Sequence, residues 1–77
     1  MTDPLDHALL DAHARSDTRA LIGLYHQAAE VAATEQATGF FLTHAYVYAL
    51  EAGDARADQL RRALVRLGRD VPAAINL

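Results

Sequence analysis

Four histidines are the residues of this chain best suited to bind a metal ion or to carry a proton. His7 and Asp11 are four residues apart, and so are His26 and Glu30. An imidazole and a carboxylate at this spacing share one face of a helix and can ligate a metal ion together. The stronger patterns, His-Glu-x-x-His and Glu-x-x-His, do not occur in the sequence. We therefore expect surface ion pairs worth about 0.3 kcal/mol each rather than a metal centre, and no cofactor.

His44 lies beside Thr43 in the most apolar segment of the chain, and His7 is its counterpart 37 residues earlier. The carboxylate of the same segment is Glu51, which lies about 10 Å along a helix from His44. That separation is too long for a hydrogen-bonded acid–base pair, and the chain has no cysteine nucleophile. We predict that the protein is not an enzyme and that His44 is a structural histidine at a helix crossing. The alternative is a small-ligand or metal-binding bundle that uses His7, His26 and His44.

Aromatic side chains of the same segment are candidates for an interface. Tyr46 and Tyr48 lie about 200° apart around a helix, so they face different neighbours. We expect one of them in the core. The other is either a packed aromatic with its hydroxyl at the rim or an interface anchor, a role in which tyrosine is enriched. The interface candidates are Phe40, Phe41, His44, Tyr46 and Tyr48.

Charges separate along the chain. The last predicted helix has a basic face of Arg61, Arg62 and Arg66. Aspartates gather near the other end, at Asp3, Asp6, Asp11 and Asp17. The opposed charges can steer an acidic partner or pair two copies head to tail. The arginine-rich segment lacks the interleaved aromatic residues of a nucleic-acid surface, and the net charge is −3, so we expect no nucleic acid as a partner.

The distribution of helix-start and helix-stop residues predicts four helices. Asp3 is a typical N-cap and Pro4 suits the first helical position, so the first helix begins there. It ends near Ala14 and buries Leu5, Leu9 and Ala12. No alternating run of β-branched residues predicts a strand.

The second helix is capped by Ser16 or Asp17 and runs out at residues 34–38, ahead of Gly39. Its apolar stripe comprises Leu21, Leu24 or Tyr25, Ala28, and Val31 or Ala32. The third helix covers about residues 38–52 and is apolar nearly all round, apart from a polar strip of Thr43, His44 and Glu51. Such a helix is buried on several sides or exposes an apolar surface to a partner.

Gly53 is suited to a left-handed C-cap, after which Asp54 starts the fourth helix. The core stripe of this helix is Leu60, Ala63, Leu64 and Leu67. Gly68 closes the helix, and the tail at residues 70–77 is too short to fold alone. We expect the tail to dock on the helices or to hang free.

The second half of the chain repeats the first at an offset of 37 residues. Six of the fourteen positions 7–20 are identical to positions 44–57. Repeats of this length usually correspond to a supersecondary unit that stacks on its copies. We therefore expect two helical hairpins, at about residues 3–34 and about residues 38–68.

Three short motifs lie in the second unit: Leu42-Thr43-His44-Ala45-Tyr46, Gly53-Asp54 and Ala63-Leu64. They resemble the leucine–small–x–x–tyrosine signature, the Gly-Asp turn and the Ala-Leu pair of tetratricopeptide repeats. The resemblance covers residues 40–68 and is degenerate, because Thr43 stands where glycine is usual and the period is 37 rather than about 34. It implies a helical-hairpin protein-binding module and no particular ligand.

The length of 77 residues indicates one small domain, and the absence of cysteine excludes disulfides. Folding at this size buries only about 60% of the chain's surface, so we expect a protein partner or a homodimer. We find no signal peptide and no apolar run of about 20 residues, and we expect a cytoplasmic protein with no membrane contact. The sequence thus predicts an all-α interaction module of two tandem hairpins or a small four-helix bundle.

Overall fold

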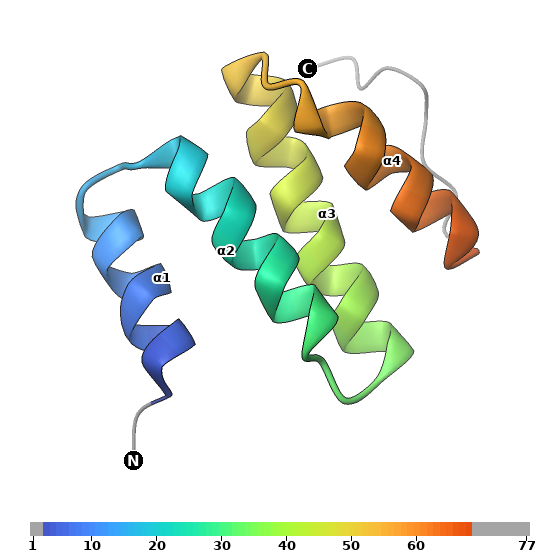
Figure 1. The fold of residues 1–77 in the computed structure, drawn as a ribbon, viewed down its shortest axis with the longest axis horizontal. Coiled ribbons are helices and arrows are strands. Elements are labelled where there is room, and N and C mark those ends of the chain that lie inside the picture. The colour runs from blue at the N-terminus through green and yellow to red at the C-terminus, as the bar shows by residue number, and fades with distance from the viewer. Residues whose placement is uncertain (1–2, 69–77) are drawn as a thin grey trace.

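The computed structural model describes residues 3–68, which form four α-helices and no strand (Figure 1). The helices are α1 (Pro4–Ala14), α2 (Thr18–Glu30), α3 (Glu35–Ala52) and α4 (Arg56–Arg66). The all-α prediction is confirmed. None of these helices has the length and apolar character needed to cross a membrane. The predicted tail at residues 70–77 lies outside the described residues.

Side-chain caps fix the helix starts. The Asp3 carboxylate accepts the backbone N–H of Leu5 at 2.8 Å, as predicted. The Asp17 carboxylate accepts that of Ala20 at 3.1 Å, so of the two predicted caps, Ser16 and Asp17, the second caps α2. The predicted boundary between the second and third helices is wrong. α2 ends at Glu30 and α3 begins at Glu35, because Thr34 caps α3 through a 3.1 Å bond from the N–H of Ala37. Gly39, which follows the predicted end of the second helix, is buried inside α3.

The two turns within the hairpins have the same backbone structure. Ser16 and Gly53 both adopt the left-handed conformation, with φ of 53° and 62°. Each donates its N–H to the carbonyl three residues earlier, at 3.1 and 3.2 Å. The N–H groups of Asp17 and Asp54 reach the carbonyl five residues earlier, at 2.9 and 2.8 Å, which completes the same helix-ending motif twice. The 37-residue repeat is therefore a repeat of structure at these turns.

Asp54 starts the fourth helix in a different way from the prediction. α4 begins at Arg56, and Ala55 occupies the cap position without a side-chain hydrogen bond. Asp54 lies two residues before Arg56, and its carboxylate accepts the backbone N–H of Arg56 at 2.9 Å. Its carboxylate also holds the Arg56 guanidinium, which donates to the backbone carbonyl of Arg19 at 3.3 Å. The start of α4 is thus tied to the start of α2.

The helices form an open array in which each packs on its neighbours in sequence. Contacts join α1 to α2, α2 to α3 and α3 to α4, and the α2–α3 contact is the most extensive. Figure 1 shows α1 and α4 on opposite sides of the α2–α3 pair. The resulting body is flat, with extents of 37 × 27 × 17 Å. Of the two expected architectures, this arrangement corresponds to tandem hairpins rather than to a closed bundle.

The core lies between α2, α3 and α4. It comprises Ile22, Ala29, Leu42, Ala45, Tyr46, Ala49, Leu60 and Leu64. The predicted core stripe of α4 is confirmed, since Leu60 and Leu64 are at most 1% exposed. The predicted stripe of α2 is incomplete, because Ile22 and Ala29 form a second buried stripe, and Val31 is 71% exposed. α2 lies between α1 and α3, so it needs two apolar faces rather than one.

Candidate functional site

Six rings from three helices gather in what we call the aromatic face: His13, Tyr25, Phe40, Phe41, His44 and Tyr48. The ring of His44 stacks on that of Tyr25, with centroids 5.1 Å apart and planes 30° apart. Tyr25 in turn stacks on Tyr48 at 5.9 Å and 19°. These stacked rings join α3 to α2. The ring of His13 on α1 meets Tyr25 and Tyr48 edge to face and so adds the first helix to the cluster. This face brings together both phenylalanines and two of the three tyrosines of the chain, while Tyr46 lies in the core.

Tyr25 and His13 join α2 to α1 by a hydrogen bond of 2.9 Å between the phenol oxygen and Nε2 of the imidazole. Burial raises the pKa of Tyr25, and the proximity of Tyr48 raises it further. The phenol therefore keeps its proton at neutral pH and can donate this bond to an unprotonated imidazole nitrogen. The sequence analysis did not select His13, because the bond depends on how α1 crosses α2.

His44 is held by its own helix and by α2. Its Nδ1 lies 2.9 Å from the backbone carbonyl of Phe40, one turn earlier. Because a carbonyl only accepts, Nδ1 carries the donated hydrogen, and in the neutral ring Nε2 is left as an acceptor. The ring also contacts that of Phe40, with centroids 4.4 Å apart. His44 thus forms a hydrogen bond and stacks on a ring of α2, but the bond lies within α3 and does not join two helices as the prediction required.

Two hollows lie on the outer face of α3. One, of about 240 Å³, is lined by Thr43, His44, Val47, Tyr48 and Glu51. The other, of about 280 Å³, is lined by Gln36, Gly39, Phe40, Thr43 and His44. The polar strip predicted for the third helix is thus confirmed, since its three members line one hollow. Phe40 borders the second hollow with 56% of its surface exposed.

The five interface candidates separate into exposed and buried residues. Phe40 is exposed, while Phe41, His44 and Tyr48 are half-buried in the aromatic face. Tyr46 is 2% exposed, so it is the tyrosine expected in the core, and its inclusion among the interface candidates is wrong. The physical reason is its angle around α3, which directs Tyr46 into the core between α2 and α4 and Tyr48 to the other side.

The basic face of α4 is partly neutralised within its own helix. Asp58 pairs with Arg61 at 3.4 Å and with Arg62 at 2.6 Å. Arg66 lies in the last turn of α4, where a positive charge complements the partial negative charge of the helix end. This arrangement is typical of a solvated helix face.

The sequence predicted a pair between His7 and Asp11, but Asp11 has another partner in the structure. Asp11 pairs at 2.9 Å with Arg15 rather than with His7, because the guanidinium offers two donors to the carboxylate from the next turn. Within residues 3–68, the structure contains no cluster of three or more side chains that could together hold a metal ion.

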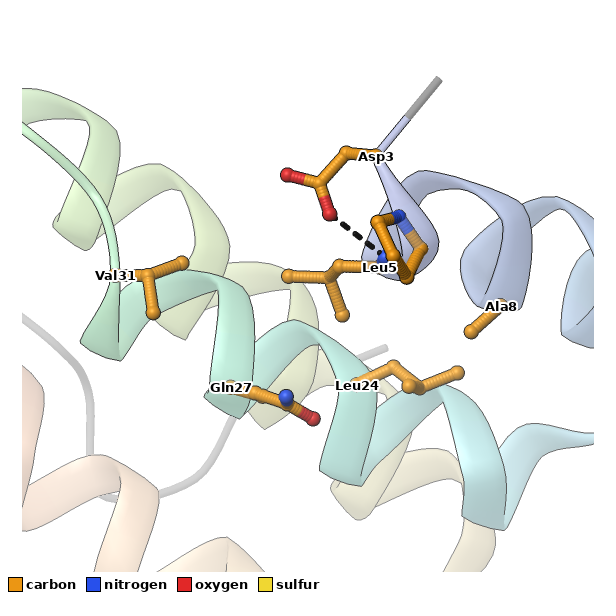
Figure 2. Close-up of a pocket in the computed structure, with 7 residues that line it drawn as sticks. Asp3, Leu5, Ala8, Leu24, Gln27 and Val31 are labelled. Atoms are coloured by element: carbon orange, nitrogen blue, oxygen red, sulfur yellow. Dashed lines mark hydrogen bonds between the residues drawn. The ribbon is translucent and has the colours of Figure 1, made fainter. Parts of the chain in front are cut away.

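A further hollow, of about 370 Å³, lies between α1 and α2 (Figure 2). Figure 2 shows Leu5 from α1 and Leu24 from α2 lying between the two helices. The carboxylate at its rim, Asp3, is engaged by the N–H of Leu5 as a helix cap. The hollow is therefore lined mainly by apolar groups and offers no pair of side chains for acid–base chemistry.

Comparisons with family models, with curated proteins and with solved structures find no match to this chain. The resemblance to tetratricopeptide repeats therefore remains a prediction.

Proposed function

We propose that this protein is a non-catalytic interaction module that associates with itself through the outer face of α3. The observation that carries the proposal is the exposure of Phe40, which is 56% accessible beside a hollow and continuous with the aromatic face. Large apolar side chains that are exposed next to hollows and aromatic clusters mark contact sites between proteins.

A catalytic role has little support in the geometry of this face. The Nδ1 of His44 is engaged by a backbone carbonyl, and the carboxylate of the same hollow, Glu51, is two helical turns away. Glu51 is therefore too far from His44 along the helix for direct proton transfer between the two side chains. We therefore assign binding rather than chemistry to the hollows.

A second copy is the partner that the composition favours. The chain has 77 residues and no disulfide, so its own core is small. Domains of this size commonly gain stability by association, which would also cover the exposed side of α3. The absence of cysteine suits a reducing compartment, and we assign the module to the cytoplasm.

The test is the solution mass, measured by light scattering after size-exclusion chromatography. The wild type should have twice the monomer mass. Phe40→Asp should be monomeric with an unchanged helix content, because it places a charge on the contact surface and not in the core. Val65→Asp is the matched control, since Val65 on α4 is 51% exposed, and this variant should remain dimeric. A monomeric wild type at protein concentrations up to about 1 mM rejects the proposal.

A further inference from the structure

The two hollows on α3 are arranged symmetrically along the helix. They share Thr43 and His44. The remaining lining residues are Gln36, Gly39 and Phe40 in one hollow and Val47, Tyr48 and Glu51 in the other. The first three lie seven, four and three residues before Thr43, and the last three lie three, four and seven residues after His44. A two-fold rotation about an axis between Thr43 and His44 therefore exchanges the lining positions of one hollow with those of the other.

This symmetry is the one that a two-fold dimer requires. In such a dimer the same patch serves both copies, so that if residue i contacts residue j, then j also contacts i. We infer that two copies pair antiparallel through α3, with the two-fold axis passing between Thr43 and His44. The inference rests on the proposed self-association and specifies its register: Phe40 faces Val47 of the second copy, and Gln36 faces Glu51 of the second copy.

The side chains at the four paired positions of α3 are compatible with this register. Positions 36, 40, 47 and 51 fall within about 60° around the helix, so one pair of helices can bring them together. The exposed ring of Phe40 meets the hollow of the second copy that Val47 and Tyr48 line. Each Phe40 thereby becomes the apolar anchor of one half of the contact, and the two halves are identical.

Charge favours the antiparallel over the parallel orientation. Glu51 lies in the last turn of α3, and Gln36 lies in its first turn. In the antiparallel pair the Glu51 carboxylate approaches the start of the other α3, where the helix has partial positive charge and the Gln36 amide can donate a hydrogen bond. In a parallel pair the two Glu51 side chains would lie side by side and repel each other.

The absence of cysteine allows a direct test of this register with single-cysteine variants. Gln36→Cys and Glu51→Cys are prepared separately, one of them with a mass tag, and the solution mass of each is measured. Each variant alone and a mixture of the two are then treated with a bismaleimide linker. In the antiparallel pair, the two introduced thiols of one variant lie about 22 Å apart along the axis, whereas the thiols of the mixed pair are opposite each other. The linker is chosen to be much shorter than that separation.

The expected result is a cross-linked dimer that contains one tagged and one untagged chain, formed only in the mixture. Gln59→Cys, at an exposed position of α4, is the control and should cross-link with neither variant. Cross-linking of each variant with itself would show a parallel pair and overturn the inference. A dimeric mass without cross-linking would place the contact on another surface, which overturns the inference but leaves the proposed function standing. Monomeric wild type and variants at about 1 mM would reject both.

Discussion

Ser16 and Gly53 occupy the same position in the two hairpins and hold the same left-handed backbone conformation, with φ of 53° and 62°. Only the second copy has the residue that adopts this conformation without steric cost. The first copy holds a serine there, and the motif still forms because its two hydrogen bonds and the Asp17 cap are retained. The repeat thus preserves a backbone geometry more strictly than it preserves residue identity.

The first prediction follows from this pair of turns. Ser16→Gly should stabilise the protein by about 0.5–1 kcal/mol, because it removes the cost of a left-handed non-glycine residue. Gly53→Ala should destabilise it by about 1 kcal/mol for the opposite reason. A Cβ at Gly53 meets no atom within 4 Å, so the loss is conformational rather than steric. Urea unfolding followed by circular dichroism measures both changes. Equal effects of the same sign in the two variants would contradict the argument.

The second prediction concerns Asp54, whose pKa is held well below its ordinary value by hydrogen bonds from the side chain and backbone of Arg56. A carboxylate with a lowered pKa stabilises the fold above the pKa it has when unfolded. That contribution is lost as the pH falls below about 4 and the group takes up a proton. Asp54→Asn should therefore lower the melting temperature at pH 7. It should also reduce the further loss on acidification, relative to the wild type.

Asp58→Asn is the control for this measurement, because Asp58 also pairs with arginines but lies on the exposed face of α4. This substitution should change the melting temperature little at either pH, since exposed ion pairs contribute little to stability. Thermal melts at neutral pH and near pH 3 separate the two cases. If both asparagine variants gave the same curve, the Asp54–Arg56 contact would have no special role.

Local signals account for the parts of the fold that the sequence predicts well. The caps at Asp3 and Asp17 and the left-handed Gly53 each depend on a few neighbouring residues. The start of α3 was harder to place, because Thr34 and Thr38 are both plausible caps. Thr34 is the residue whose hydroxyl accepts a backbone N–H, and the hydroxyl of Thr38 donates to the Thr34 carbonyl at 3.0 Å.

The features that the sequence did not predict depend on the order in which the helices pack against one another. A single apolar stripe was expected for α2, but its position between α1 and α3 requires a second stripe through Ile22. The hydrogen bond between His13 and Tyr25 likewise exists only because α1 crosses α2 at that point. The polar strip of α3 was predicted because its members share one helix, and helical periodicity alone places them together.

The third prediction concerns this hydrogen bond between α1 and α2. Tyr25→Phe removes the hydroxyl while keeping the stacked ring, and it should cost about 0.5–1 kcal/mol of stability. His13→Phe keeps a ring at the edge of Tyr25 and Tyr48 but removes the bond from the other side. The double variant should cost less than the two single changes combined, by about 0.5 kcal/mol. Strict additivity in urea unfolding would mean that the bond contributes nothing to stability.

The fourth prediction exchanges charges across the inferred dimer. Glu51→Lys places a positive charge near the positive end of the other α3, and Gln36→Glu places a second carboxylate beside Glu51 of the other copy. Each change should weaken dimerisation roughly two- to fivefold. Within one chain, both changes complement the helix dipole of α3, so weaker association cannot be attributed to a less stable helix.

Combining Glu51→Lys with Gln36→Glu should restore association, because each introduced lysine then faces an introduced glutamate of the other copy. Sedimentation equilibrium at low and high salt measures the dissociation constants of the wild type, the two single variants and the double variant. The recovery should shrink at high salt, since screening weakens an exposed ion pair. If the double variant dissociated as readily as the weaker single variant, positions 36 and 51 would not face each other, and the antiparallel register would be wrong even for a protein that dimerises.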